Sequence, residues 1–347
     1  HHRCHNFFHK IEKILLYLKE EIKQTFSNDE LFDFFKKDRR ILLFLIKEDI
    51  ITVTDSMYKN FVNFKIKILE KKSYFYFYPE IKKILSKNTI TKIEEELKII
   101  GKNRLDDFEE KRLKGENDSL ICSLIRNDKA EDFISYASRT NLSLSSKISP
   151  SIYETNSFLL KNEPSLIEYA AFFGSIQVFK YLILNNVEIN SNLWVYAIHS
   201  QNPELIHILE LNKVKIVDDY YEKCLKESIK CHHNDIANYI LNNFIDEKDQ
   251  KKKYKTKFGN NIFDFAFHYQ NYLFFPQDFK NKFFAFYLCK YDYLTLTSLF
   301  FQYIKTVKNN KIKQIDESKK EKNDVKQIKE SKKEKNDVDE INESKKE

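Results

Sequence analysis

The stretch SLIEYAAFFGSIQVFKYLILNNVEIN (residues 165–190) contains two apolar segments that are separated by a single glycine, Gly174. Apolar side chains recur in both segments every three or four residues, which is the spacing of an amphipathic helix. Two adjacent alanines precede the glycine, and the sequence after the second segment is typical of extended chain. The stretch therefore predicts two helices, over 166–173 and 176–184, that are joined by a turn at Gly174.

Three weaker copies of this unit follow along the chain. They begin at Asn192, Glu227 and Gly259, and each has a small residue at the place of Ala170. Successive small residues are 27, 31 and 38 positions apart, an average of 32. A period of this length is typical of helical repeat proteins, in which a small residue lets neighbouring helices approach closely. The small residues that correspond to Ala170 are Ala197, Ser228 and Ala266.

The first unit resembles an ankyrin repeat. Residues 165–171 match the family's T-P-L-H-x-A-A segment, and Gly174 matches the glycine of its turn. Two residues depart from the family's pattern: Leu166 replaces the proline that starts the helix, and Glu168 replaces the structural histidine. Residues 117–244 as a whole resemble the divergent ankyrin domain of large protist protein families.

This resemblance implies an all-α fold whose central part, residues 113–304, is an ankyrin-repeat helical solenoid. Residues 1–112 have apolar side chains at helical intervals with Lys and Glu between them, so they predict an N-terminal region of amphipathic helices. The apolar run 41–46 and the aromatic run 74–78 also fit short strands or buried turns. We interpret the aromatic run as a hydrophobic wedge between helices rather than a ligand-stacking site.

Residues 305–347 form a Lys/Glu-rich tail of low complexity. The unit ESKKEKND recurs at an interval of 13 residues from Glu317, and the tail has no aromatic residue. Its few apolar residues cannot bury enough surface to offset chain entropy, so the tail is predicted to be disordered. A coiled coil is the alternative, but Val and Ile of the repeated unit are spaced by 3 and 10 rather than in heptads.

Composition excludes several classes of protein. The 347 residues include only 4 glycines, all isolated, and 5 prolines. No two glycines fall within the span of a phosphate-cradling loop, and so few turn residues argue against a β-sandwich or barrel. The formal net charge is +7, of which the tail carries +3. The rest of the chain therefore lacks the charge excess typical of nucleic-acid binding, and we expect no nucleic-acid partner.

The distribution of cysteines and apolar residues bears on the compartment. Five scattered cysteines, an odd number, predict a reducing environment rather than a disulfide framework. The nearest approach to a membrane span, residues 283–304, is interrupted by Lys290, Asp292 and Gln302, so it predicts a core helix. We expect an intracellular, cytoplasmic protein with no membrane span.

Residue types that bind metals gather at one place in the sequence. Cys224, Cys231, His232 and His233 lie within ten residues of one another. A zinc site usually draws pairs of ligands from two elements, and only one element contributes here. Cys231 and His232 also fall where Gly174 lies in the first unit, so we interpret them as part of a turn between helices and expect no metal site.

Catalytic chemistry is not indicated. The chain has no H-E-x-x-H, G-x-S-x-G, C-x-x-C or EF-hand motif, and neither His199 nor His207 has a nucleophile at a recognisable spacing. Trp194, the sole tryptophan, falls on a predicted inner helix and is expected to lie in the core. We therefore expect no enzyme activity, no cofactor and no small-molecule substrate.

The resemblance implies a non-enzymatic scaffold that binds a protein partner through the concave surface of its repeats. Ankyrin proteins bind through hairpin tips and through the exposed end of each inner helix. The alternative is an enzymatic or nucleic-acid-associated effector that uses residues 1–112. Carried onto this chain, the helix ends are Phe172, Phe173, His199, Ser200, Lys230, Cys231, His268 and Tyr269.

Overall fold

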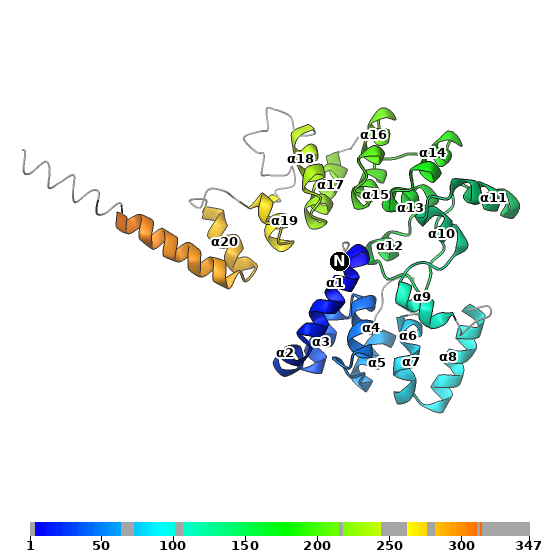
Figure 1. Cartoon of the computed structure of the whole chain (residues 1–347), viewed down its shortest axis with the longest axis horizontal. Helices are drawn as coiled ribbons and strands as arrows, with labels where there is room; N and C mark the ends of the chain where they lie inside the picture. The colour runs from blue at the N-terminus through cyan, green and yellow to red at the C-terminus, as the bar shows by residue number, and fades with distance from the viewer. Residues whose placement is uncertain are drawn as a thin grey trace, which may run out of the picture. The chain divides into compact units, whose positions relative to one another are not determined.

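The protein is all-α in the computed structural model. It describes residues 4–63, 73–100, 107–214, 218–243, 262–275, 282–310 and 313. These residues form about 20 helices and no strand, with an isolated bridge between Lys147 and Ser165. The predicted helical class is confirmed. The chain divides into two compact units, His1–Lys251 and Lys252–Glu347 (Figure 1).

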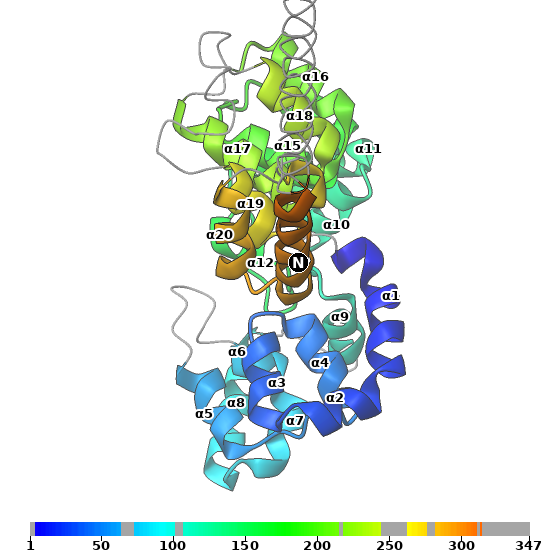
Figure 2. The same ribbon diagram turned by 90° about the vertical axis from the view of Figure 1, so that its left-hand side faces the viewer.

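The first unit begins with a group of short helices around a hydrophobic core (Figure 2). Leu42, Leu45, Met57, Tyr76 and Ile81 are all fully buried in this core. The helices around it are α1 (Cys4–Tyr17), α2 (Lys19–Thr25), α3 (Asn28–Phe35), α4 (Arg39–Lys47), α5 (Asp55–Asn63), α6 (Ser73–Tyr76) and α7 (Tyr78–Ile81). The next helices, α8 (Lys87–Ile100) and α9 (Phe108–Lys114), contribute to two smaller hydrophobic clusters.

Both exceptional runs of the N-terminal region belong to helices. The apolar run 41–46 lies inside α4, where Ile41, Leu42, Leu43 and Leu45 are buried, so the strand alternative is wrong. Its polar neighbours start the helix, because the Asp38 side chain accepts a hydrogen bond from the backbone N–H of Ile41. In the aromatic run, residues 75–78 are all buried. That run is therefore core, as the wedge interpretation predicts.

An ion pair joins α9 to this core. The guanidinium of Arg112 is fully buried and donates to both carboxylate oxygens of Glu80, at 2.5 and 2.8 Å. It also donates to the backbone carbonyl of Tyr76 at 2.9 Å, and the Tyr76 hydroxyl donates to the carbonyl of Arg112 at 2.9 Å. Glu109 accepts a further hydrogen bond from the same guanidinium. A planar guanidinium suits this bidentate pairing, which fixes α9 against α6 and α7.

Helices in residues 120–243 of the first unit form pairs. The first helix of each pair contacts its own second helix and also the first helix of the next pair, in chain order from α10 to α13, α15 and α17 (Figure 1). The pairs are α10 (Leu120–Arg126) with α11 (Ala130–Thr140), α13 (Leu166–Phe173) with α14 (Ile176–Leu184), α15 (Leu193–Ser200) with α16 (Pro203–Leu211), and α17 (Asp218–Lys230) with α18 (Asn234–Asn243). The predicted bounds 166–173 and 176–184 are those observed.

The turns within these pairs share one backbone geometry. A residue with positive φ ends each first helix. In α13, α15 and α17 the residue four positions before it is the small residue that the sequence aligns with Ala170, whereas α10 has Leu124 there. The backbone N–H of Ser175 donates to the carbonyl of Ala170, and that of His233 donates to Ser228, as in a Schellman motif. The positive-φ residues are Gly174 (73°), Gln201 (55°), His232 (56°) and, in the second unit, Gln270 (54°). The small residues Ala170, Ala197, Ser228 and Ala266 are all completely buried, which confirms the burial expected of Ala170 and Ala197.

Successive turns also contact one another. A Cβ atom at Gly174 would lie 3.3 Å from the Cβ of Ser200 in the next turn, so both the positive φ and the space favour glycine there. The Ser175 hydroxyl donates to the carbonyl of Ile125 at 2.5 Å in the preceding pair. His233 Nδ1 lies 2.5 Å from the carbonyl oxygen of Ile198 in its own preceding pair. Ile198 and Ile125 are equivalent, because each lies three residues before the positive-φ residue of its turn. These equivalent hydrogen bonds join one pair to the next.

Glu168 takes part in a further link between pairs. Its side chain completes a capping box with Ser165 at the start of α13. Its other oxygen accepts a hydrogen bond from the Asn192 side chain at 2.6 Å, just before α15. Glu168 therefore connects the α13–α14 pair to the α15–α16 pair.

The burial of Ala170 makes its enlargement costly. Ala170→Leu should lower the free energy of unfolding by about 1 to 3 kcal/mol, because the extra carbons have no space between α13 and its neighbours. Gln177→Leu adds an apolar side chain at an exposed position of α14 and should change stability by less than about 0.5 kcal/mol. Urea titrations followed by circular dichroism measure both. Equal midpoints for Ala170→Leu and the parent would contradict the observed packing.

A connector precedes α13 and contains α12 (Ser157–Asn162). Glu154 lies buried in it, and its carboxylate accepts hydrogen bonds from the backbone N–H groups of Asn156 at 2.7 Å and Asn117 at 3.3 Å. Burial nevertheless raises the pKa of Glu154 to about 7, since these hydrogen bonds and the charge of Arg126 offset only part of the desolvation.

This raised pKa predicts a pH dependence of stability. The folded chain binds the Glu154 proton more tightly than the unfolded chain, whose carboxyl titrates near 4.5, so stability falls as the pH rises from about 4.5 to about 7. Between pH 5 and pH 8, the free energy of unfolding of the parent should fall by about 2 to 3 kcal/mol more than that of Glu154→Gln. Chemical denaturation at both pH values measures the difference. Glu131→Gln, at an exposed site, should keep the parental profile.

The second unit contains α19 (Ile262–His268), α20 (Lys282–Lys290) and a helix over residues 294–310. The ring of Phe267 stacks on Phe275 and Tyr287, with centroid distances of 3.8 and 5.4 Å. The last helix extends past Lys305, where the predicted tail begins, and the tail residues 311–312 and 314–347 lie outside the described residues. In the part of the chain that the structure describes, no helix is both long enough and apolar enough to span a bilayer.

Candidate functional site

The predicted binding residues occupy equivalent places in the structure. At the ends of α13, α15, α17 and α19 they are the two residues directly before the positive-φ turn residue. Their exposure differs from helix to helix. Phe172 and Cys231 are buried and the His199 side chain is only 2% exposed, whereas Phe173, Ser200, Lys230 and Tyr269 are half-buried and His268 is exposed.

Three of these residues meet across the first helices of three successive pairs in the first unit. The ring of Phe172 on α13 lies 4.8 Å from the imidazole of His199 on α15. Phe158 on α12 covers the same imidazole at 4.3 Å. His199 Nδ1 in turn lies 3.6 Å from the Sγ atom of Cys231, at the end of α17. Protein binding by these positions stays a prediction, while their packing role is visible in the structure.

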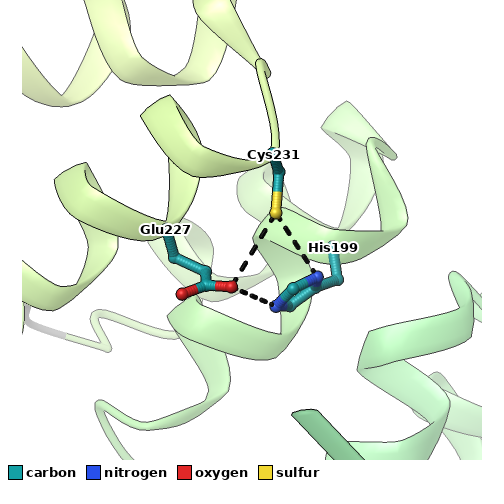
Figure 3. A group of neighbouring side chains, drawn as sticks. All are labelled: His199, Glu227 and Cys231. Atoms are coloured by element: carbon teal, nitrogen blue, oxygen red, sulfur yellow. Dashed lines mark hydrogen bonds and ion pairs between the residues drawn. The ribbon is translucent and has the colours of Figure 1, made fainter. Parts of the chain in front are cut away.

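His199 and Cys231 form a compact polar cluster with Glu227 (Figure 3). Glu227 Oε1 lies 3.2 Å from His199 Nε2 and 3.8 Å from Cys231 Sγ. Glu227 and Cys231 are four residues apart at the end of α17, so their side chains emerge on one face, one turn from each other. The ammonium of Lys230 contacts the same Oε1 at 2.8 Å. One imidazole, one carboxylate and one thiol thus converge between α15 and α17.

The electrostatics of the cluster follow from its burial. Burial lowers the pKa of His199, so the imidazole is neutral near pH 7. Burial acts in the opposite sense on Glu227, but its hydrogen bond with His199 and the charge of Lys230 outweigh desolvation and lower the pKa of this carboxyl. Burial raises the pKa of the Cys231 thiol to about 12. The thiol therefore keeps its proton near pH 7, and a protonated thiol is a weak nucleophile.

The structure separates the cysteines and histidines that the sequence groups together. Cys231 belongs to the cluster, but His233 binds the carbonyl of Ile198 and His232 is the positive-φ residue of the turn, as the turn interpretation predicts. Burial raises the pKa of Cys224 to about 12, and this thiol lies outside the cluster. Sequence analysis missed Glu227. Its spacing of four from Cys231 on a helix was the available signal.

Comparisons with protein-family models, with curated proteins and with solved structures find no match to this chain.

Proposed function

We propose that the chain is a non-enzymatic scaffold that binds a protein partner, and that its helix pairs between residues 120 and 243 stack as an ankyrin-like solenoid. The observation that carries this proposal is the equivalence of successive turns. The first helix of each pair ends at a residue with positive φ, and α13, α15 and α17 each bury a small residue four positions before it. In addition, α10, α13 and α15 each contact the first helix of the next pair. Stacks of this kind present an extended surface, which suits protein partners better than small molecules.

The ends of α13, α15 and α17 supply the proposed binding surface. Phe173 and Lys230 are half-buried there, so each combines contact area with a firm support. Phe173 packs on Tyr169 with a ring distance of 4.7 Å, and the Arg126 guanidinium lies 6.0 Å from its ring centroid. Aromatic side chains and Arg are enriched at protein interfaces, so Phe173 and the neighbouring Arg126 are expected to contribute most of the binding energy.

The alternative effector role of residues 1–112 has weaker support. Two of its arginines serve the packing of the helices: Arg112 is buried in its ion pair, and the Arg40 guanidinium lies 4.0 Å from the ring centroid of Phe8. Basic groups used in this way do not contribute to an electrostatic surface for phosphates.

A matched pair of variants tests the scaffold. Phe173→Gln combined with Lys230→Gln alters the proposed surface, whereas Lys180→Gln combined with His207→Gln alters exposed side chains of α14 and α16. Both should keep the parental helicity. Proteins captured by the parent and by the control, then identified by mass spectrometry, should bind the surface variant at least about tenfold more weakly in titrations.

Two outcomes would contradict this assignment. Equal affinity of the surface variant and the parent would move binding away from the ends of α13 and α17. Loss of binding on deletion of residues 314–347 alone would make the tail the recognition element.

A further inference from the structure

We propose that His199, Glu227 and Cys231 form a zinc site that holds one Zn²⁺ ion between α15 and α17. This site goes beyond the scaffold role and was not expected from the sequence. It would use one nitrogen, one oxygen and one sulfur ligand, which are the three donor types that zinc takes in proteins. The ion would link two successive helix pairs.

The three side chains lie close enough to share one ion after a small change of side-chain torsions. Zinc bonds of about 2.0 to 2.3 Å at tetrahedral angles separate ligand atoms by about 3.3 to 3.5 Å. The observed separations are 3.2 Å from His199 to Glu227, 3.6 Å from His199 to Cys231 and 3.8 Å from Glu227 to Cys231. His199 presents a different ring nitrogen to each neighbour, but one atom of each residue can be chosen so that all three lie within 4.8 Å of one another. A turn of the imidazole would therefore complete the set.

The backbone already fixes the three positions. The backbone N–H of Cys231 donates to the carbonyl of Glu227 at 2.8 Å, which holds these two ligands one helical turn apart. His199 lies in the last turn of α15, and α15 packs directly on α17. Phe158 and Phe172 pack against the imidazole and restrict its surroundings. Ligands on packed helices are held more accurately than ligands on loops, so the backbone of the site can stay in place while the imidazole of His199 turns.

Charge balance also favours a divalent cation. A thiolate at Cys231 and the carboxylate of Glu227 would together neutralise Zn²⁺, and the thiol proton would pass to the buffer as the metal–sulfur bond forms. In the structure the ammonium of Lys230 contacts Glu227 Oε1 at 2.8 Å. That ammonium competes with the ion for the same oxygen. Three protein ligands leave the fourth zinc position for a water molecule.

Zinc binding can be measured on the full chain once the potential metal ligands near its N-terminus are replaced. Every protein tested would carry alanine in place of His1, His2, Cys4, His5 and His9, since these residues also have metal-binding side chains. Titration with Zn²⁺ alone should then show one ion per chain. Co²⁺, used as a visible probe, should show a thiolate-to-cobalt charge-transfer band.

The variants have opposite expected effects. Cys231→Ser and Glu227→Gln should weaken Zn²⁺ binding by more than about tenfold, since even the outer partners of zinc ligands contribute 10- to 100-fold. Cys224→Ser removes another buried thiol of α17 and should leave the affinity unchanged. Lys230→Met removes the competing ammonium and should tighten Zn²⁺ binding. If Lys230 had only a structural role, its replacement would not tighten binding.

Two results would overturn the proposal: no stoichiometric Zn²⁺ in the chain without N-terminal histidines, or equal affinity for Cys231→Ser and the parent. In either case the cluster would be a hydrogen-bonded contact between helices only. If Cys231→Ser does not fold, as judged by circular dichroism, the charge-transfer band and the Lys230→Met titration decide the question. A missing band together with unchanged affinity in Lys230→Met would then reject the site.

Discussion

Arg112→Met should lower the free energy of unfolding by about 3 to 5 kcal/mol. The substitution removes one partner of a buried ion pair and leaves the other as an uncompensated charge. A charge of this kind is strongly destabilising in a low-dielectric interior. Glu80, whose side chain is only 13% exposed, would lose both of its hydrogen bonds to the guanidinium. The buried carbonyl of Tyr76 would lose its donor as well. Methionine keeps most of the aliphatic volume, so the effect reports on charge and hydrogen bonding rather than on a cavity.

A double variant separates these contributions. Arg112→Met combined with Glu80→Met should recover part of the loss, because replacing both partners removes the uncompensated buried charge. Lys114→Met breaks an exposed pair with Glu110 on the same helix and should change stability by less than about 1 kcal/mol. Urea denaturation followed by circular dichroism gives all three values. A loss below 1 kcal/mol for Arg112→Met would show that the pair does not hold α9 against the core.

Trp194→Ala should also lower the free energy of unfolding by about 3 to 5 kcal/mol. The side chain is 1% exposed and lies in α15, the helix that contacts α13, α16 and α17. Its indole N–H donates to the carbonyl of Val214 at 2.8 Å, so the substitution both opens a cavity and leaves a carbonyl without this donor. Trp194→Phe keeps part of the side-chain volume, so its free energy of unfolding should fall less than that of Trp194→Ala.

The measurement for this variant needs a probe other than fluorescence. Trp194 is the sole tryptophan, so Trp194→Ala has no tryptophan fluorescence. Circular dichroism must therefore follow the unfolding of the parent and of the variants. Leu184→Ala provides the control, because this leucine is 80% exposed and its truncation should change stability by less than about 0.5 kcal/mol. Similar losses for Trp194→Ala and Leu184→Ala would place the indole outside the core.

Much of the repeat region could be predicted because its signals are local. The bounds of α13 and α14 follow from apolar spacing and from Gly174, the residue best suited to positive φ. The N-terminal region was harder. Residues 41–46 are apolar in an unbroken run, and such a run fits a strand as well as a buried helix. Asp38, which starts α4, shows its role only once its hydrogen bond to Ile41 is visible.

The sequence by itself determined the helical class, the pairing of helices and the alignment of Ala170, Ala197 and Ser228. These features depend on side-chain period and turn stereochemistry within a few residues, so the sequence carries them directly. Only the tertiary structure decided that His199 meets Glu227 and that Arg112 points inward to Glu80. Such contacts join residues about 30 positions apart, and they depend on how whole helices pack, a relation that no local pattern of residue types encodes.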